Sequence, residues 1–334
     1  MTVSPPNVPT ISILIPALRP DWLDTAIASA LAQTWQDFEL LIGDDSSDDR
    51  IGSVVRKWDD ARIRYVRNPR PRQPGTNRDH LIELACGEYL KFLFDDDLLL
   101  PRSIELLLQA CRETGAPLAF HARHLIDTKG CVLGSPMLVA AGERVVLEPS
   151  AVFERMVSGC VNLIGEPTNI LVHRQTLRAI DAPFSLDGHR MRFLTDMALY
   201  ANFASRSHSL VAVGYLGAGF RQHAAQASVG DAPGRSAGYF EWDLLRRWAV
   251  DNGHLDRHAY ERDRRTMRAM YRQIMGRYPE VKAFVDLLDS GPDETSRWPA
   301  LDADFQEALA MAYAQIEIRK LRRAETLAAT PATP

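Results

Sequence analysis

The feature that most constrains the fold is an alternation of short apolar runs with helix-period segments between Thr10 and about Val139. The runs have the length of β-strands, and they lie at residues 11–15, 38–43, 62–66, 89–94, 118–126 and 132–138. After the first run, apolar residues from Leu23 to Leu31 recur at three- and four-residue spacing, as on one face of a helix. Repeated strand–helix units build a mostly parallel sheet covered by helices, so the sequence predicts an α/β fold.

Three of these runs end directly before candidate site residues. They are Pro16 and Ala17 after the first run, Asp44 after the second, and Asp95–Asp97 after the fourth. Ligands of a parallel sheet bind at the carboxyl ends of its strands, so these are the first candidate site residues. Three adjacent carboxylates repel one another, and either a divalent cation, our leading interpretation, or a set of hydrogen-bond donors offsets that repulsion. The alternative is a solvated acidic loop that caps the helix starting near Pro101.

Composition and missing motifs exclude several classes of protein. A chain of 334 residues with 46% hydrophobic and 25% charged residues is globular, and a formal charge of −4 argues against nucleic acid as the main partner. No Gly-x-Gly-x-x-Gly follows the first run and no P-loop motif occurs, so neither a Rossmann dehydrogenase nor a P-loop enzyme is supported. The four cysteines are widely spaced, as expected of reduced thiols. The start of the chain lacks a signal-peptide pattern and no apolar run reaches about 18 residues, so we expect a cytoplasmic protein without a membrane span.

Turn signals divide the chain into three expected parts. We predict one domain over residues 1–230, a helical region over 231–325 after the Gly- and Pro-containing turn at 230–234, and a disordered tail over 326–334. In the helical region an apolar stripe recurs at helical spacing, at Tyr260, Met267, Tyr271, Ile274 and Tyr278.

The ordered motifs together resemble those of a family 2 glycosyltransferase with the GT-A fold. The resemblance covers about residues 1–225, and it rests on residues 11–16, 28–35, 38–48, 78, 82–90, 92–97 and 101. Its first implication is a nucleotide-sugar donor lying over the strand ends. Pro16, Ala17 and Asp44 would then surround the base and ribose, and Arg78 would reach the donor phosphates. A surface salt bridge is the alternative for Arg78.

The resemblance also implies that Mg²⁺ or Mn²⁺ bridges the donor diphosphate to the acidic segment. Many members of the family read Asp-x-Asp-Asp where this chain has Phe94 followed by three aspartates. Counting back from the proline at 101 places Asp95 near the ribose and Asp96 on the metal, with Asp97 as the rival ligand. A late Arg-x-His element matches Arg221 and His223, which would neutralise the leaving group and bind the metal or a phosphate, respectively.

Two acidic residues match acceptor-side elements of the family. Asp196 corresponds to the general base of a Glu-Asp element, although this chain lacks the preceding Glu. A helix N-cap is the alternative role for Asp196. Glu166, in the segment Gly165–Thr168, corresponds to a loop whose carboxylate would bind sugar hydroxyls.

The function implied by the resemblance is inverting transfer of a sugar from a nucleotide-diphosphate donor, UDP being the commonest type, to a hydroxyl group. The acceptor would be a glycan, a lipid-linked glycan or a protein, in cell-surface polysaccharide, lipopolysaccharide or glycoconjugate biosynthesis. A metal-dependent nucleotidyltransferase is the enzymatic alternative, and it would release pyrophosphate. A non-catalytic nucleotide-sugar-binding scaffold is the other alternative, favoured by the missing Glu before Asp196.

The end of the chain is outside the resemblance and has a pattern of its own. Residues 304–323 are predicted to form a helix with one apolar face, made of Phe305, Leu309, Ala312 and Ile316. Basic residues gather at its end, at Arg319, Lys320, Arg322 and Arg323. They suit the helix dipole, and they also suit peripheral contact with the anionic inner face of a membrane. A homodimer formed through the C-terminal helices is a further explanation of the apolar face.

Overall fold

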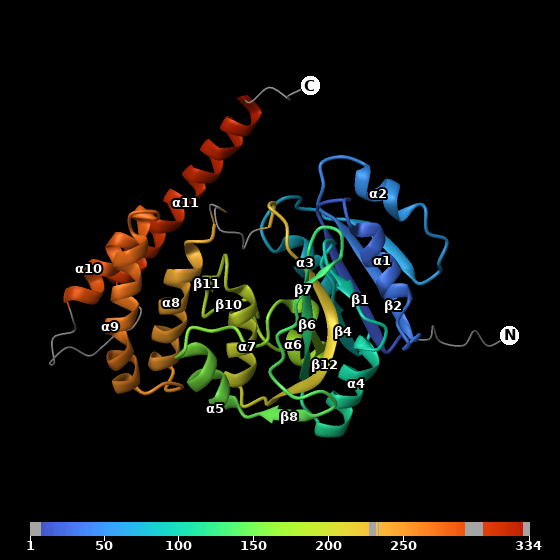
Figure 1. Ribbon diagram of the computed structural model, residues 1–334, viewed down its shortest axis with the longest axis horizontal. Helices are drawn as coiled ribbons and strands as arrows, with labels where there is room; N and C mark the ends of the chain where they lie inside the picture. Colours follow the sequence, from blue (N-terminus) through green and yellow to red (C-terminus); the bar gives the residue numbers. More distant parts are fainter. Residues whose placement is uncertain (1–7, 227–231, 233, 291–302, 330–334) are drawn as a thin grey trace. The chain divides into compact units, whose positions relative to one another are not determined.

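A computed structural model of the chain describes residues 8–226, 232, 234–290 and 303–329 (Figure 1). The chain forms two compact units that alternate along the sequence. The first unit contains the residues up to Pro149 together with 163–181 and 207–223, and the second contains 150–162, 182–206 and the residues from Ala224 onward.

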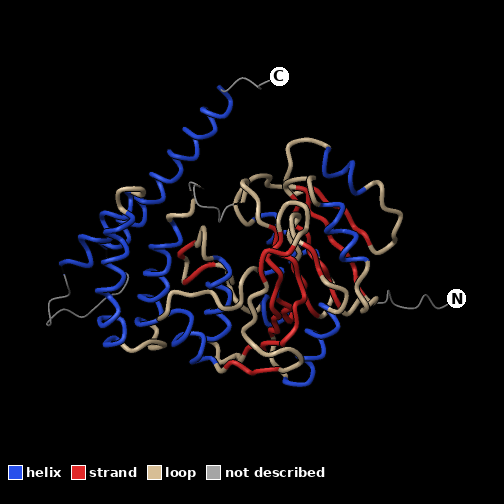
Figure 2. The backbone as a smooth tube through the Cα atoms, in the orientation of Figure 1, coloured by secondary structure: helices blue, strands red, loops and turns tan. Residues whose placement is uncertain are grey.

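The first unit is built on one mixed sheet, in which ten strands pair among the described residues (Figure 2). In spatial order the main path is β3 (Ile63–Arg67), β2 (Phe38–Asp44), β1 (Ile11–Ala17), β4 (Tyr89–Phe92), β9 (Ile170–His173), β6 (Leu118–Ile126), β12 (Leu210–Arg221) and β5 (Leu98–Leu99). Two short strands pair at its margins: β7 (Val132–Gly134) pairs with β6, and β8 (Arg144–Leu147) pairs with β12.

Six of these strands run in the same direction. β1, β2, β3 and β4 are parallel neighbours, and β9 is antiparallel both to β4 and to β6. Because β12 is parallel to β6, the carboxyl ends of β1, β2, β4 and β12 all lie at the same edge of the sheet. The predicted α/β fold with a mostly parallel sheet is therefore confirmed.

Helices cover both faces of this sheet. α1 (Leu23–Leu31) and α4 (Ser103–Thr114) bury apolar residues in the same core as Ile11, Ile13 and Ile15 of β1, with α1 against β5 and α4 against β6 and β12. α3 (Thr76–Leu84) packs on the opposite face, where a Cβ at Gly43 would meet the side chains of Asn77 and Leu81. The remaining helices of this unit are α2 (Arg50–Val55), α6 (Arg174–Arg178) and the 3-10 turn Pro167–Asn169.

Two predicted strands end earlier in the structure. The run 89–94 is a strand only as far as Phe92, and the run 132–138 only as far as Gly134. Phe94 and the acidic residues after it form the turn into β5. Met137 and Leu138 are exposed, so these apolar residues lie outside the core that their pattern suggested.

The second unit is mainly helical. Its elements are α5 (Pro149–Ala151, which starts in the first unit), the π-helix Val152–Val157, β10 (Ser185–Leu186), β11 (His189–Arg190), α7 (Thr195–Ser205), α8 (Ala237–Asp251), α9 (Arg257–Ile274), the 3-10 turn Pro279–Val281, α10 (Lys282–Ser290) and α11 (Ala303–Ala329). Stacked aromatic rings of Phe240 and Phe284, with Phe305 edge-on to Phe284, form part of its core. Of the predicted stripe, Tyr260, Met267, Tyr271 and Tyr278 are buried and Ile274 is half-buried.

The two units differ from the division expected from the sequence. Residues 150–162 and 182–206 fall within the single domain predicted for 1–230, yet they pack with the C-terminal helices. The reason is local composition, because every residue from Met197 to Ala204 in α7 is buried and the helix needs cover on all sides. The expected turn at 230–234 lies mostly outside the described residues.

The last helix also departs from expectation. α11 continues to Ala329, into the segment predicted as a disordered tail, and residues 330–334 lie outside the described ones. Leu and Ala at 327–329 are good helix formers, which accounts for the extension. The predicted apolar face is buried within this unit, whereas Met311, Ile318 and Leu321 are exposed. In the described parts of the chain, no helix combines the length and the apolar character that crossing a bilayer requires.

Candidate functional site

The acidic segment lies at the shared carboxyl edge of the sheet, in the turn between β4 and β5. Asp95 is buried, and its Oδ2 atom accepts hydrogen bonds from the backbone N–H groups of Leu18 and Arg19, each at 2.7 Å. Burial raises the pKa of Asp95, and these two N–H groups act against that rise. Asp95 therefore fixes the loop that follows β1 to the acidic segment.

Asp96 pairs with His223, which follows the end of β12. Its Oδ2 atom lies 2.9 Å from His223 Nε2, and the two side chains are 15% and 4% exposed, respectively. The imidazole packs against Trp22, with ring centroids 4.7 Å apart. Three segments that are far apart in sequence thus meet around one carboxylate–imidazole pair.

Arg221 supports this pair from the last position of β12. Its Nε donates to the carbonyl of Asp96 at 2.9 Å, and its Nη1 donates to the carbonyls of Asp127 at 2.9 Å and Thr128 at 3.3 Å. The guanidinium carbon also lies 5.3 Å from the ring centroid of Trp22. Burial lowers the pKa of Arg221, while Asp97, Asp96 and Asp127 act in the opposite direction. The buried guanidinium of Arg221 thus lies in contact with the backbone of the acidic segment.

Asp97 is directed into the protein. It is fully buried, its Oδ1 accepts from the backbone N–H of Arg221 at 3.1 Å, and its Oδ2 accepts from Thr168 Oγ1 at 2.7 Å. Burial, and next the charge of Asp96, raise the pKa of Asp97 well above its usual range. Of the three predicted metal ligands, the structure brings Asp96 and His223 into contact. Asp97 instead bonds to Thr168 and to the β12 backbone.

Lys91 is a buried lysine near this edge that the sequence analysis did not single out. Its Nζ donates to the carbonyls of Thr168 at 2.5 Å and Ile170 at 3.2 Å, tying β4 to the segment before β9. Burial lowers its pKa well below the usual value, and the charge of Asp97 opposes that shift. The available signal was a single lysine inside the apolar run 89–94.

Glu166 is paired with Arg123 of β6. Arg123 Nε lies 2.9 Å from Glu166 Oε2, and burial raises the pKa of Glu166 while Arg123 lowers it. The preceding Gly165 has a φ of 86°, and a Cβ added there would lie 2.3 Å from Arg123 Nη1. The positive φ thus favours glycine at 165, and a Cβ there would also displace the Arg123 guanidinium.

Replacing Gly165 with alanine should lower the free energy of unfolding and disturb the Arg123–Glu166 pair. The left-handed backbone alone costs roughly 1–3 kcal/mol, and the close contact adds to it. Gly130→Ala is the matched control, because Gly130 has a φ of 89° with no atom within 4 Å of an added Cβ. Urea unfolding curves compare the two variants. Equal destabilisation would mean that the contact with Arg123 has no energetic weight.

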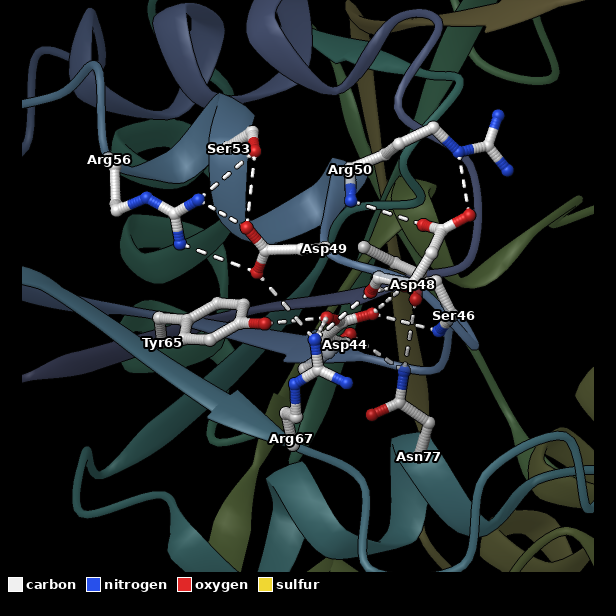
Figure 3. Close-up of polar contacts among 12 residues, drawn as sticks. Asp44, Ser46, Asp48, Asp49, Arg50, Ser53, Arg56, Tyr65, Arg67 and Asn77 are labelled. Atoms are coloured by element: carbon white, nitrogen blue, oxygen red, sulfur yellow. Dashed lines mark hydrogen bonds and ion pairs between the residues drawn. The ribbon is translucent and has the colours of Figure 1, made fainter.

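Asp44, the last residue of β2, is buried in a polar cluster (Figure 3). Its Oδ1 accepts from the backbone N–H of Ser46 at 2.8 Å and from Ser46 Oγ at 2.6 Å, and its Oδ2 accepts from Tyr65 Oη at 2.5 Å. Arg67 Nη2 lies 3.7 Å from Asp44 and also 3.7 Å from Asp49. Asp44 thus holds together the ends of β2 and β3 at the expected donor edge.

Asn77 lies beside the expected donor residues at this edge. Its Nδ2 donates to the carbonyls of Gly43 at 2.8 Å and Ala17 at 3.5 Å, while its Oδ1 is buried without a hydrogen-bond partner. Pro16 is half-buried at the end of β1. Arg78, the next residue of α3, donates to Asp79 Oδ1 from Nε at 3.0 Å and from Nη2 at 2.9 Å. Arg78 and Asp79 thus form an ion pair, which matches the salt bridge considered as the alternative role of Arg78.

Asp196 belongs to the second unit, where it is the second residue of α7. Its Oδ2 accepts from Asn162 Nδ2 at 2.6 Å and its Oδ1 from the backbone N–H of Met197 at 2.8 Å. The N-cap position belongs to Leu194, so the alternative N-cap role of Asp196 does not match the structure. Asn162 was not predicted, since a lone Asn in a loop gives no signal.

Metal-binding capacity at the sheet edge is limited to a pair of side chains. In the ranges that the structure describes, no group of three or more His, Cys, Asp or Glu side chains could hold a metal ion. A cation at Asp96 and His223 would need further ligands from a bound diphosphate and water.

Comparison with known proteins identifies the part of the chain that carries this edge. Residues 12–148 match the family model described as glycosyl transferase family 2. This matched segment is similar to family 2 glycosyltransferases, and it is called the family 2 domain below. Asp44, Asp95, Asp96 and Asp97 lie inside this domain, whereas Arg221 and His223 lie beyond the matched residues.

Curated relatives are similar to about a third of the chain. The GalNAc(5)-diNAcBac-PP-undecaprenol β-1,3-glucosyltransferase of Campylobacter jejuni is 36% identical over 32% of this chain and 36% of that protein. The UDP-Glc:α-D-GlcNAc-diphosphoundecaprenol β-1,3-glucosyltransferase WfgD of Escherichia coli is 24% identical over 36% of this chain and 49% of that protein. The matches therefore span about a third to a half of these relatives.

Solved structures share the fold over a larger part of the chain. S. aureus TarS 1-349 in complex with UDP-GlcNAc has a TM-score of 0.54 and 11% sequence identity, and the likeness covers 84% of this chain and 87% of that one. The same TarS segment in complex with UDP has a TM-score of 0.52 and 16% identity, with 92% and 88% covered. This likeness confirms the predicted GT-A fold for the glycosyltransferase domain and its surroundings.

Proposed function

We propose that the protein transfers a sugar, with inversion, from a nucleotide-diphosphate donor to a hydroxyl acceptor. The observation that carries the proposal is the Asp96–His223 pair, which links the family 2 domain to a residue beyond it at the carboxyl edge of the sheet. The β-1,3-glucosyltransferase relatives support this reaction over nucleotidyl transfer.

A UDP sugar is the donor type that we propose. The TarS structures of similar fold contain UDP-GlcNAc and UDP, and they support this choice. Pro16, Ala17, Asp44 and Asp95 would line the base and ribose, since they end β1 and β2 or follow β4 at the same edge. Arg78 would contact the phosphates after leaving Asp79, with which it pairs here.

The residues at the pair fit a Mg²⁺ or Mn²⁺ ion held jointly with the donor. Asp96 and His223 provide one carboxylate and one imidazole, and burial, with a smaller contribution from the charge of Asp96, raises the pKa of Asp97 and of Glu166. Carboxylate and imidazole groups are ligands that such a cation accepts, with the diphosphate and water completing its shell. The ion, when bound, would stabilise negative charge on the diphosphate.

The protein's own groups would share the remaining work of transfer. Asp196 would accept the proton of the acceptor hydroxyl, and the donors Asn162 and Met197 N–H hold its carboxylate in one orientation. Arg221 and His223 would stabilise the departing nucleoside diphosphate. Glu166 would accept hydrogen bonds from sugar hydroxyls beside Arg123.

A lipid-linked acceptor is the class that we propose. The two glucosyltransferase relatives are named for undecaprenol-linked substrates, which supports a role in polysaccharide or glycoconjugate assembly. Such an acceptor places the reaction at the cytoplasmic face of a membrane.

Ligand-dependent melting tests the donor class first. A panel of nucleoside diphosphates and nucleotide sugars, each with and without Mn²⁺, should raise the melting temperature selectively for UDP compounds. A shift that needs Mn²⁺ supports the joint cation site. No shift with any nucleotide would contradict the proposed donor site.

Membrane contact and dimerisation through α11 are tested separately. Arg319 pairs with the buried Glu280 and Lys320 pairs with Glu317, so these two charges already serve the helix packing. We expect the protein to float weakly with anionic liposomes, in a salt-sensitive way, and deletion of residues 319–334 should abolish this flotation. Flotation that the deletion does not change would contradict the membrane role of α11.

A dimer would instead use the exposed Met311, Ile318 and Leu321 of α11. Light scattering would detect loss of the dimer in a variant with all three residues replaced by serine.

A further inference from the structure

A fully buried carboxylate in α8 binds the chain where α7 begins. Glu241 is 0% exposed, and its oxygens accept hydrogen bonds from three consecutive backbone N–H groups. Arg192 N lies 2.7 Å from Oε1, while Phe193 N and Leu194 N lie 3.0 Å and 2.7 Å from Oε2. The hydroxyl of Tyr313 in α11 donates to Oε1 at 2.7 Å. One side chain thus joins α8, α11 and the entry to α7.

The entry to α7 needs such an acceptor. Leu194 is the N-cap residue, and its apolar side chain makes no capping hydrogen bond. The N–H groups of the N-cap residue and of the first turn lack partners within the helix, so the N–H of Leu194 needs an outside acceptor, which Glu241 provides. A carboxylate also suits the positive end of the helix dipole. Burial raises the pKa of Glu241, and the N–H groups of Leu194 and Arg192 act against that rise.

The turn that Glu241 holds also carries Asp196. Asp196 is the second residue of α7, two positions after Leu194, and its carboxylate is aimed by hydrogen bonds to Asn162 and to the backbone of α7 itself. A shift of the first turn would therefore move this carboxylate. Displacements of about 1 Å at a reacting group lower rates by roughly 100-fold.

We propose that Glu241, held by Tyr313, is the positioning residue for Asp196. This inference rests on the proposed function, because Asp196 matters only if it acts as the base. Two further contacts join α11 to the same entry segment: Arg192 Nη1 lies 3.0 Å from Glu317, and its guanidinium lies 4.1 Å from the ring centroid of Tyr313. The C-terminal helix, outside the family 2 domain, thereby sets the geometry of the proposed base.

Two variants test the inference at different severity. Glu241→Gln presents an N–H group to at least one of the three backbone donors, and Tyr313→Phe removes only the hydroxyl. We expect kcat to fall by about 10- to 100-fold for Glu241→Gln and by a smaller factor for Tyr313→Phe. The KM for the donor and the dissociation constant for UDP should stay within about twofold, because only the base is displaced.

The matched control is Asp243→Asn. Asp243 lies in the same helix and is equally buried, but it bonds to Arg247 at 3.1 Å and to Tyr260 at 2.8 Å. Its replacement should lower the melting temperature without changing kcat at temperatures where the variant is folded. Hydrogen exchange adds a readout that does not depend on activity. The backbone amides of residues 192–197 should exchange faster in Glu241→Gln than in the parent protein, and their exchange rates should be unchanged in Asp243→Asn.

The outcomes separate this inference from the proposed function. Unchanged kcat in Glu241→Gln and Tyr313→Phe, with kcat lost in Asp196→Asn, would overturn the positioning role alone. Unchanged kcat in Asp196→Asn would overturn the base and the inference with it. Should Glu241→Gln fail to fold, Tyr313→Phe decides: kcat lowered with donor KM unchanged supports the role, and kcat equal to that of the parent protein overturns it.

Discussion

Replacing Asp96 with asparagine should lower sugar transfer by about 10²- to 10³-fold or more while the protein stays folded. The carboxylate forms the pair with His223, and it would supply the negative charge that a cation on the donor diphosphate requires. Asparagine keeps the size of the side chain but has no charge. Turnover measured with Mg²⁺, with Mn²⁺ and with EDTA checks the prediction, and circular dichroism confirms the fold.

A carboxylate of the same unit serves as the control for Asp96. Asp48 follows β2, is half-exposed and pairs with Arg50 at 2.8 Å. We expect Asp48→Asn to keep nearly full activity, since its ion pair is at the surface. Full turnover of the parent protein in excess EDTA would exclude the cation site, whatever the effect of Asp96→Asn.

Asp196→Asn should lower turnover by roughly 10²- to 10⁴-fold, as expected for loss of a general base. Donor affinity should change little, because the residues proposed to bind the donor all belong to the first unit of the chain and Asp196 belongs to the second. Steady-state kinetics with varied acceptor and a separate UDP binding measurement check both parts.

The partner of Asp196 provides a graded comparison. Asn162→Ala removes the hydrogen bond to Asp196 Oδ2 but leaves the carboxylate of Asp196 in place. Its effect on kcat should therefore be smaller than that of Asp196→Asn. Normal turnover in Asp196→Asn, combined with a lower melting temperature, would give Asp196 a structural role in α7 instead.

The part of the fold that follows from local patterns was predictable from the sequence. The runs that became β1, β2, β3 and β4 are short, apolar and separated by helix-period segments, so neighbouring parallel strands followed. The position of Asp95–Asp97 at the carboxyl edge followed for the same reason. The family resemblance, through its late Arg-x-His element, then predicted that Arg221 and His223 lie at that edge too.

The parts that depend on distant pairing were not predictable. β9 enters the sheet between β4 and β6 although it lies far later in the chain, and nothing local signals that place. The inward direction of Asp97 depends on Thr168, which reaches it only because β9 is there. Glu241 likewise looks like an ordinary helical residue in the sequence, and only the packing of α8 against the start of α7 reveals its bonds.

The most direct test of the proposed reaction is analysis of the products formed from a UDP sugar and an undecaprenyl-diphosphate-linked saccharide in the presence of Mn²⁺. We expect UDP and a lipid-linked product longer by one sugar in equal amounts, with inverted configuration at the anomeric carbon. Release of pyrophosphate from nucleoside triphosphate and sugar phosphate would identify a nucleotidyltransferase. Binding of UDP sugars without any turnover, across a range of lipid-linked and soluble acceptors, would contradict catalysis and favour a scaffold.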